Sequence, residues 1–307
     1  MNKGFWQGKR VLITGHQGFV GSHLSRALIK LGAEVMGLDI KSGDDVGDYE
    51  LVQCLVAKRK PQIIYHLAAE AIVGNVHKIP RRAFVTNIGG TWNILEVTRT
   101  YRDIEATIIA SSDKAYGEHR ILPYREDFPL RAKYPYDASK ACADMLAQSY
   151  INNYHLPIAI TRCCNIFGPG DPNLCRLVPN AINCWLGNEL LEVRGNGKFV
   201  RDFVYIDDVI RAYLLIAERF KKLDINNRVF NIGCNKPITI KEFVRLLDKL
   251  THGNLCCKFV KVSYGEIKRQ YLSACKAKRI LGWKPEYTLQ EGLLATMGKA
   301  IEHGAYC

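Results

Sequence analysis

The sequence contains no uninterrupted apolar stretch of about 18 residues, which is the length that a membrane-spanning helix needs. Its first residues, Met1 to Trp6, also lack the apolar segment of a secretory signal peptide. We therefore expect a cytoplasmic protein with no membrane partner. At 307 residues, the chain is long enough for one large domain or two modest ones.

The sequence has no C-x-x-C motif, although it contains 11 cysteines. Their number is odd, and they are either scattered or adjacent, as in Cys163-Cys164 and Cys256-Cys257. This spacing favours neither a disulfide framework nor a zinc site. We therefore expect buried free thiols and no bound metal.

The chain also lacks a basic tail and has no aromatic residues interleaved with its basic ones, although its formal net charge is +13. Lysine and arginine occur in short groups along the sequence, such as Lys58-Arg59-Lys60 and Arg81-Arg82. This distribution predicts a solvated surface that attracts anions, and no nucleic-acid partner.

A glycine motif near the amino end is the first pattern that points to a ligand. The segment from Arg10 to Thr14 predicts a buried strand, and Gly15, Gly18 and Gly21 follow it at the start of a helical pattern. Glycines at this spacing let the backbone approach a pyrophosphate, to which the helix N-terminus offers its N–H groups. The motif predicts a dinucleotide site.

A second predicted strand, Glu34 to Asp39, ends in an acidic residue 18 positions after Gly21. An acid at this distance binds the adenosine ribose hydroxyls and repels a 2′-phosphate, so NAD is favoured over NADP. No strand is evident between Lys41 and Asp48, and a helix is predicted from about Tyr49 to Arg59. The sheet is therefore expected to be thin at this edge.

Strand and helix patterns continue to alternate. Gln62 to Ala69 predicts a strand, a helix is expected from about Arg82 to Arg102, and Ala106 to Ala110 predicts the next strand. Further along, Arg228 to Ile232 predicts a strand that returns to the same sheet. The alternation predicts an α/β fold with a doubly wound parallel sheet.

Hydroxyl and titratable side chains gather after the strand that ends at Ala110. Ser111 to Lys114 follow it directly, and ligands bind at the carboxyl ends of the strands in such sheets. Tyr136 and Lys140 are four residues apart at the start of a helical pattern that runs from Ala138 to about Tyr154, so they share one face. Proton-transfer chemistry needs such a set of groups.

In this order, the motifs resemble those of the extended short-chain dehydrogenase/reductase family of nucleotide-sugar enzymes. The resemblance covers nearly the whole chain and is carried by Thr14 to Gly21, His66 to Ala69, Asn87 to Thr91, Tyr136-x-x-x-Lys140, Arg162 with Asn165, Gly168 to Gly170, Arg201 to Asp208 and Leu281 to Pro285. It implies a Rossmann domain of residues 1–168 and 201–233 that binds NAD. A smaller C-terminal α/β domain of residues 169–200 and 234–307 would bind the substrate.

The resemblance also implies roles for individual residues. Ser112, Tyr136 and Lys140 would be the catalytic triad, and Asp45 would accept a hydrogen bond from the adenine amine. NAD would also be held by Gly15, Gln17, Gly18, Phe19, Val20, Gly21, Asp39, Leu67, Ala68, Ala69 and Asn87, together with Tyr136 and Lys140. The nucleotide part of a nucleoside-diphosphate hexose would contact Asn165, Leu177, Val178, Arg201 and Arg269.

The two residues after Ser112 distinguish subgroups of the family. Epimerases commonly carry inert residues there, whereas hexose 4,6-dehydratases carry an acid and a base. Asp113-Lys114 looks most like the CDP-glucose 4,6-dehydratases, and also like the inverting UDP-N-acetylglucosamine 4,6-dehydratases. We therefore expect an NAD-dependent 4,6-dehydratase, with CDP-glucose as the first choice of substrate and a 4-keto-6-deoxy sugar as the product.

Other possibilities stay open at this point. A 4-epimerase would use only Ser112, Tyr136 and Lys140, and the net charge leaves a non-catalytic NAD-binding protein or a basic RNA-binding protein as a third class. The segment from Arg201 to Tyr205 has the general family form rather than that of the CDP-glucose type, which leaves the nucleotide open. By the same resemblance, a homodimer is expected through the helices after Asn87 and after Tyr136, with a surface drawn from Trp92, Ile94, Leu95, Met145 and Tyr150.

Overall fold

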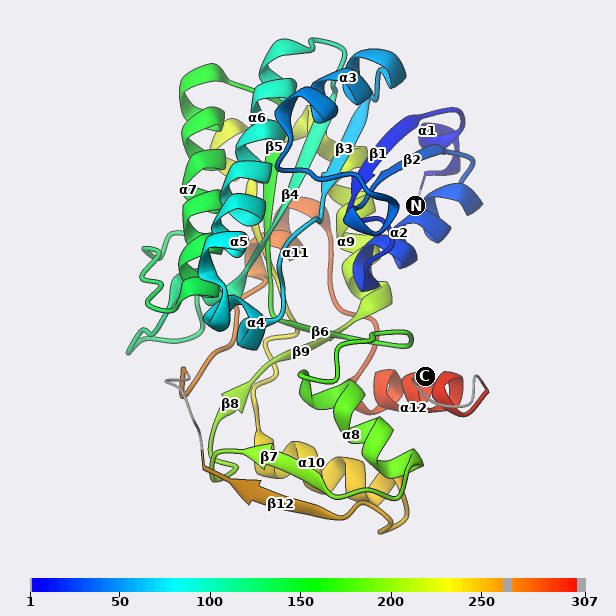
Figure 1. Ribbon diagram of the computed structural model, residues 1–307, viewed down its shortest axis with the longest axis vertical. Helices are drawn as coiled ribbons and strands as arrows, with labels where there is room; N and C mark the ends of the chain where they lie inside the picture. Colours follow the sequence, from blue (N-terminus) through cyan, green and yellow to red (C-terminus); the bar gives the residue numbers. More distant parts are fainter. Residues whose placement is uncertain (1, 262–266, 303–307) are drawn as a thin grey trace.

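A six-stranded parallel sheet forms the centre of the molecule (Figure 1). The computed structural model describes residues 2–261 and 267–302. In spatial order the strands are β10 (Val229–Ile232), β5 (Ile158–Cys163), β4 (Ala106–Ser112), β3 (Ile63–His66), β1 (Arg10–Thr14) and β2 (Glu34–Leu38). Every neighbouring pair is parallel, and the order reverses between β1 and β3. The sheet is doubly wound, which confirms the predicted fold class.

The alternation of side chains along the strands divides the core into two layers. Val11 and Ile13 belong to one apolar cluster, whereas Leu12 between them belongs to the other. The helices that cover the first layer are α2 (Phe19–Lys30) and α9 (Ile206–Arg219). Those that cover the second are α3 (Tyr49–Arg59), α6 (Gly90–Thr100) and α7 (Pro135–Tyr154). Both faces of the sheet are therefore shielded from water, as parallel strands with two apolar faces require.

A second group of elements lies beyond the carboxyl ends of the strands, in the lower part of Figure 1. It contains α8 (Leu177–Leu186), β7 (Leu191–Arg194), α10 (Ile240–Leu250), β12 (Cys257–Val260) and α12 (Leu289–Glu302). β12 pairs with β7 in parallel. Two further strand pairs are β6 (Asn165–Phe167) with β9 (Phe203–Tyr205), and β8 (Val200–Arg201) with β11 (Ile238–Thr239). The shorter helices are α1 (Lys3–Trp6), α4 (Val73–Lys78), α5 (Pro80–Phe84) and α11 (Cys275–Leu281).

The helices on either side of the predicted site differ from the sequence expectation. The helix expected from about Arg82 to Arg102 is broken by a π-helical turn, Val85–Gly89, between α5 and α6. Helix α7 begins at Pro135, earlier than the expected Ala138, because proline is favoured at the first helical position. Strand β5 was not predicted, because its apolar pattern is interrupted by Arg162.

The edge of the sheet ends where the sequence predicted. After β2, the chain passes through a short 3₁₀ turn, Ile40–Ser42, and a loop into α3. No strand occurs between Lys41 and Asp48, all of which the structure describes. β2 therefore remains the outermost strand beside the glycine turn.

The burial of the cysteine side chains differs from the sequence prediction. The ten cysteines in the described part of the chain are all free, as expected. Only Cys163, Cys164 and Cys184 are buried, so the expectation of buried thiols is wrong for most of them. The exposed ones lie on helix surfaces and in loops, at Cys54, Cys142, Cys175, Cys256 and Cys275.

Two further observations concern the outer surface. Among the described residues, none of the helices has the length and apolar character needed to cross a membrane. The face considered for a dimer is smaller than expected, because Ile94 and Leu95 are fully buried in the core. Trp92 and Met145 do lie on the outer surface and are more than half exposed.

Candidate active site

The turn between β1 and α2 can be built only with glycine. Gly15 has a φ of +71°, and a Cβ at this position would lie 2.8 Å from the Ala68 backbone nitrogen. A Cβ on Gly21 would lie 2.1 Å from the Gly15 carbonyl oxygen. Gly18 is the N-cap of α2, followed in the first turn by Phe19 and Val20, so the first free N–H groups of the helix point into this turn. The turn is a cradle that fits a pyrophosphate.

Asp39 organises the loop beside this cradle. Its carboxylate accepts hydrogen bonds from the backbone N–H groups of Gln17 (2.8 Å) and Lys41 (3.0 Å). Both oxygens keep a lone pair for a further donor, such as a ribose hydroxyl. His16 Nδ1 lies 4.0 Å from Asp39 Oδ2 and is buried without a hydrogen-bond partner in the described part of the chain. The unpartnered nitrogen and the glycine cradle both fit a bound dinucleotide.

Gly37 on β2 has a role that the sequence did not indicate. A Cβ at Gly37 would lie 2.3 Å from the His16 ring, so this glycine leaves room for the imidazole beside Asp39. Asp45, by contrast, is exposed, and its Oδ1 accepts a hydrogen bond from the Gly47 backbone N–H at 2.8 Å. Its contact with an adenine amine stays a prediction.

The segment after β3 is fixed to the glycine turn by buried polar groups. The Thr14 hydroxyl accepts hydrogen bonds from the Leu67 and Ala68 N–H groups, each at 3.2 Å. His66 lies between the hydroxyls of Thr14 (2.8 Å) and Thr91 (3.0 Å). Burial lowers the pKa of His66 to about 3, so its ring is neutral. These contacts hold the segment that ends in Ala69 close to the cradle.

Asn87 joins that segment to the helix of the predicted catalytic pair. Its side-chain oxygen accepts a hydrogen bond from the Glu70 N–H (2.8 Å), and its side-chain nitrogen donates to the Ser139 hydroxyl (2.9 Å). Asn87 is almost fully buried within the π-helical turn. Asn87 therefore connects the segment after β3 to the first turns of α7, and its cofactor-binding role stays a prediction.

The predicted catalytic lysine is tied to the central strand. Lys140 Nζ donates a hydrogen bond of 2.7 Å to the Ala110 carbonyl on β4. Burial lowers the pKa of Lys140 to about 8, although Asp144 and Cys163 oppose this effect. The first turns of α7 are thereby fixed against the end of β4.

Tyr136 lies on the same helix and is half-buried beside Ser112. Burial raises the pKa of its phenol to about 12. Arg176 and a hydrogen bond with the Ser112 hydroxyl act in the opposite direction, and Asp137 adds to the rise. In the chain alone, the phenol is therefore protonated at neutral pH, and it needs a further positive charge nearby to become a base.

Asp113 is a buried acid at the end of β4. Its Oδ1 accepts a hydrogen bond from the Ser112 hydroxyl at 3.2 Å, whereas its Oδ2 is buried with no partner in the described part of the chain. Burial raises the pKa of Asp113 to about 6, against the effects of Lys114 and Arg201. A carboxyl with a pKa of about 6 and a free oxygen can exchange a proton near neutral pH, so it is suited to donate one to a ligand.

Ser112, Asp113 and Tyr136 line a cavity of about 620 Å³. Of the predicted residues, it brings together Ser112, Asp113, Lys114, Tyr136, Asn165, Leu177, Val178 and Arg201, and it reaches Val20 at the edge of the glycine cradle. Arg269 is not among the lining residues, because its backbone bridges to Val200 and its side chain is exposed. A role for Arg269 at the nucleotide stays a prediction.

Three lining residues were given no individual role from the sequence. The Ser111 hydroxyl is buried without a partner in the described part of the chain, and Asp137 is a buried acid directly after Tyr136. Arg176 lies at the N-cap of α8, where an ion pair of 3.0 Å with buried Asp171 holds it. The available signal for the first two was their position next to predicted catalytic residues.

A buried ion pair between Arg162 and Asp144 is connected by hydrogen bonds to the turn of residues 113–116, which contains Asp113 and Lys114. Arg162 on β5 makes two hydrogen bonds of 2.8 Å to Asp144 on α7, and both side chains are almost fully buried. Arg162 also donates to the Tyr116 hydroxyl at 2.8 Å, and that hydroxyl donates to Asn231 at 2.8 Å. The network joins α7, β5 and β10 to the turn that follows Lys114.

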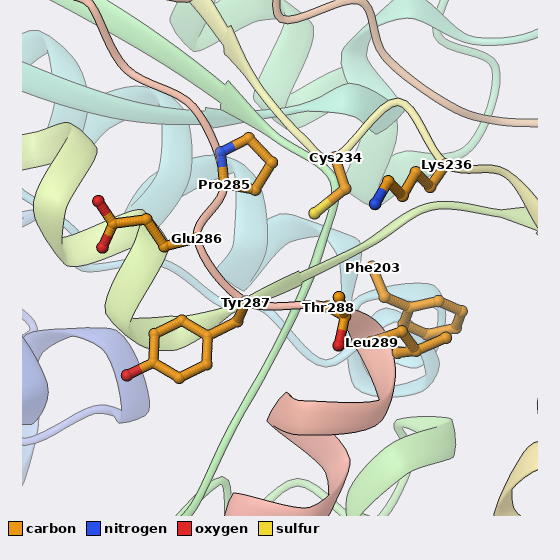
Figure 2. Close-up of a pocket in the computed structure, with 8 residues that line it drawn as sticks. All are labelled: Phe203, Cys234, Lys236, Pro285, Glu286, Tyr287, Thr288 and Leu289. Carbon is orange, nitrogen blue, oxygen red and sulfur yellow. The ribbon is translucent and has the colours of Figure 1, made fainter.

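A second hollow of about 120 Å³ lies at the start of α12 (Figure 2). It is lined by Phe203, Cys234, Lys236, Pro285, Glu286, Tyr287, Thr288 and Leu289. None of the predicted catalytic residues reaches it, and the Tyr287 and Glu286 side chains point away from the Lys236 side. The larger cavity is therefore the candidate active site.

The reversal of strand order between β1 and β3, with a glycine cradle beside it, defines a dinucleotide-binding protein of the Rossmann type. Comparison with known proteins narrows this class. The model of the NAD dependent epimerase/dehydratase family matches residues 11–233. The chain belongs to this family, which confirms the family resemblance and the predicted cofactor, NAD.

Individual relatives cover almost the whole chain. CDP-glucose 4,6-dehydratase of Salmonella typhimurium is 28% identical over an alignment of 346 positions, gaps included, which covers 98% of this chain and 92% of that protein. The structure of UDP-glucose 4-epimerase from Thermotoga maritima, with UDP-glucose, is similar with a TM-score of 0.89 and 30% identity, covering 95% and 99% of the two chains. dTDP-glucose 4,6-dehydratase from Bacillus anthracis, in complex with NAD, has a TM-score of 0.86 and 27% identity, covering 97% and 98%. The chain is thus similar to both dehydratases and epimerases.

Proposed function

We propose that the protein is an NAD-dependent nucleotide-sugar 4,6-dehydratase that converts a nucleoside-diphosphate hexose into its 4-keto-6-deoxy derivative. The observation that carries the proposal is the pair Asp113 and Lys114, which lines the cavity directly beside Ser112 and Tyr136. An epimerase has no use for a further acid and base at this position. Similarity to a CDP-glucose 4,6-dehydratase supports CDP-glucose as the first substrate to test.

The first step is assigned to Tyr136, Ser112 and Lys140. Tyr136 removes the proton from the C4 hydroxyl, and Ser112 donates a hydrogen bond to the oxygen on which charge develops. NAD, held in the glycine cradle, would supply the hydride chemistry for oxidation at C4 and reduction at C6. Because burial raises the pKa of Tyr136 to about 12 in the chain alone, the positive charge of a bound nicotinamide ring would be needed in addition to Lys140 to favour the phenolate.

The second step is assigned to Asp113 and Lys114. The ketone at C4 acidifies the C5 hydrogen, and Lys114 in its neutral form takes this proton. The C5–H electron pair forms the C5=C6 bond, and the C6 hydroxyl leaves as water with the proton of Asp113. The free Oδ2 of Asp113 and its high pKa support the donor role. Lys114 then returns its proton to C5 when the hydride reaches C6.

The test is incubation with CDP-, dTDP- and UDP-glucose and with UDP-N-acetylglucosamine, followed by mass spectrometry and NMR. Loss of one water with a ketone at C4 supports a dehydratase, whereas an intact hexose inverted at C4 refutes it. In the same assay, Lys114→Ala should bind NAD as the wild type does and form no 4-keto-6-deoxy product. Unchanged turnover would contradict the role of Lys114.

A 4-epimerase is the second candidate, favoured by the similarity to a UDP-glucose 4-epimerase at a TM-score of 0.89. It would need only Ser112, Tyr136 and Lys140. Asp113→Asn separates the two, because an epimerase should keep most of its turnover in this variant and a dehydratase should lose it.

The proposal includes the arrangement of the chain around the substrate. Residues 1–168 and 201–233 would bind NAD, and residues 169–200 and 234–307 would bind the nucleotide sugar. Asn165, Arg201 and the Leu177-Val178 pair would contact the nucleotide, a placement supported by their position on the cavity wall. Trp92, Met145 and Tyr150 would form the dimer surface of α6 and α7, and light scattering of Trp92→Glu tests this contact.

A further inference from the structure

The turn that carries Asp113 and Lys114 is anchored at its far end by Tyr116, a residue that the mechanism above does not use. The turn is one short 3₁₀ helix, Asp113–Tyr116, so the position of its last residue constrains the position of the first two. Tyr116 is fully buried. It is not among the described residues that line the cavity, so it can affect the reaction only through the turn.

The Tyr116 hydroxyl is the middle of a chain of hydrogen bonds whose direction is fixed. Asn231 on β10 donates its side-chain N–H to the Tyr124 carbonyl (3.0 Å), so its side-chain oxygen faces the phenol as an acceptor. Tyr116 therefore donates to Asn231 Oδ1 (2.8 Å) and accepts from Arg162 Nη1 (2.8 Å). Burial raises the pKa of the Tyr116 phenol, so it keeps the proton that it donates.

The other end of this chain of hydrogen bonds reaches the helix that carries Lys140. Arg162 donates two hydrogen bonds of 2.8 Å to Asp144, which lies about one helical turn after Lys140 on α7. We call the chain Asp144–Arg162–Tyr116–Asn231 the phenol relay. It connects the helix that carries the groups of the first step to the turn that carries the groups of the second step.

We propose that Tyr116 is a positioning residue, whose hydroxyl holds the turn of Asp113 and Lys114 in a fixed place relative to Tyr136 and Lys140, so that elimination follows oxidation of the same bound sugar. This inference rests on the proposed dehydratase function. The two steps act on adjacent carbons of one hexose, so the two sets of groups must keep a defined separation. A displacement of about 1 Å can lower the rate of such a step about 10²-fold.

The other contacts of Tyr116 make its hydroxyl a group that can be removed alone. The backbone carbonyl of Tyr116 accepts a hydrogen bond from the Arg131 N–H (3.0 Å). Its ring centroid lies 5.0 Å from that of Tyr124, and the Arg162 guanidinium lies 4.8 Å from the Tyr116 ring centroid. A phenylalanine at this position can keep all three contacts. Tyr116→Phe therefore tests the two hydrogen bonds of the hydroxyl.

The experiment compares wild type and Tyr116→Phe in a single turnover of the nucleoside-diphosphate glucose that the wild type converts. Oxidation at C4 should continue at nearly the wild-type rate, because Tyr136 and Lys140 stay on their helix. Elimination should slow by roughly 10- to 100-fold, because Asp113 and Lys114 are no longer held in place. Reduced nicotinamide should therefore accumulate in the absorbance spectrum, and kcat should fall with little change in KM.

Hydrogen exchange measures the same effect in the protein without substrate. The Gly117 N–H donates to the Lys114 carbonyl (3.1 Å) and closes the turn. In Tyr116→Phe this amide should exchange faster, whereas amides in the middle of α7 and β10 should keep their wild-type rates. A hydroxyl that only stabilises the fold predicts faster exchange throughout and an unchanged ratio of oxidation to elimination.

A second variant and a control complete the comparison. Asn231→Ala removes the acceptor of the Tyr116 hydroxyl and should also slow elimination, and the double variant should lose little more than either single variant, because both changes break the same relay. Tyr65→Phe is the matched control. Tyr65 is an equally buried phenol on β3, and its hydroxyl donates to the Tyr213 carbonyl at 3.1 Å, outside the relay. This variant should leave the ratio of oxidation to elimination unchanged.

The outcomes distinguish this inference from the proposed function. No 4-keto-6-deoxy product from the wild type refutes both. Product from the wild type, with an unchanged ratio of oxidation to elimination in Tyr116→Phe, overturns only the role of Tyr116. If Tyr116→Phe does not fold, Asn231→Ala provides the same test. Loss of folding in both variants would show that the relay serves stability alone, which also overturns the role.

Discussion

Lys140 Nζ donates a hydrogen bond of 2.7 Å to the carbonyl oxygen of Ala110, two residues before Ser112 on the same strand. The contact joins the helix that carries Tyr136 to the strand that ends in Ser112 and leads directly into Asp113 and Lys114. It also places an ammonium group where little water reaches it, which is why the pKa of Lys140 falls to about 8. Burying the Lys140 ammonium group at this position therefore lowers the free energy of unfolding at neutral pH.

Replacing Lys140 by methionine should reveal that cost. The folded pKa of about 8 lies below the ordinary 10.5, so at pH 7 the ammonium form destabilises the fold by roughly 3 kcal/mol, and stability rises as pH increases from about 8 to 10.5. The lost hydrogen bond offsets about 1 kcal/mol. Lys140→Met should therefore raise the free energy of unfolding in urea at pH 7 by about 2 kcal/mol, lose this advantage near pH 10, and lose turnover about 10²-fold or more.

The control for that measurement is Lys9→Met, at a partly exposed lysine 2.6 Å from Glu105. Surface pairs of this kind contribute about 0–1 kcal/mol, so this variant should lose a little stability and keep its activity. A lower unfolding free energy for Lys140→Met at pH 7 would contradict the predicted cost of its burial.

Asp113→Asn should raise the free energy of unfolding at pH 7, although a dehydratase should lose its turnover in this variant. The folded pKa of about 6 lies above the ordinary 3.8, so the wild type loses stability as pH rises from about 4 to 6 and does not regain it above 6. At pH 7 the neutral asparagine should be more stable by about 3 kcal/mol, and this difference should vanish near pH 4. Urea unfolding at the two pH values measures it. A difference that is the same at both would show that Asp113 does not titrate in this range.

The Arg162–Asp144 ion pair should be among the strongest single contributions of a polar contact to stability. Removing one partner leaves the other buried and charged, so Asp144→Asn or Arg162→Met should lower the free energy of unfolding by about 3–5 kcal/mol. The exposed pair Arg125–Asp127 is the matched control, and Asp127→Asn should change stability by less than about 1 kcal/mol. Similar losses in the two variants would contradict the importance of burial.

Gly21→Ala should abolish the cofactor site. The added methyl group would lie 2.1 Å from the Gly15 carbonyl oxygen, so the turn must open, at a cost of roughly 1–3 kcal/mol. NAD binding, measured by titration calorimetry, should become undetectable. Gly298→Ala in α12 is the control, because its methyl group meets no atom within 4 Å and alanine is favoured in a helix by about 0.5–1 kcal/mol. Normal NAD binding by Gly21→Ala would refute the assignment of the cradle.

Much of the fold was predictable because local patterns agree with it. Buried parallel strands are apolar on both faces, and glycine is required where the chain turns between β1 and α2, so both leave a clear signal in the sequence. β5 was missed because Arg162 interrupts its apolar pattern, and the charge of Arg162 is paired with that of Asp144 from another element. The π-helical turn around Asn87 has no sequence signal of its own.

The sequence by itself determined the fold class, the cofactor and the chemical types at the site, because these depend on residues close together in the chain: the glycine turn, Asp39, Ser112 to Lys114 and the Tyr136–Lys140 pair. Only the tertiary structure decided which groups share the cavity and which are shielded from water. It brought Arg176 and Arg201 from two separate segments to the cavity wall beside Tyr136 and Asp113, and it left Arg269 outside. Burial and charge depend on what surrounds a side chain from all directions, and no stretch of sequence contains that information.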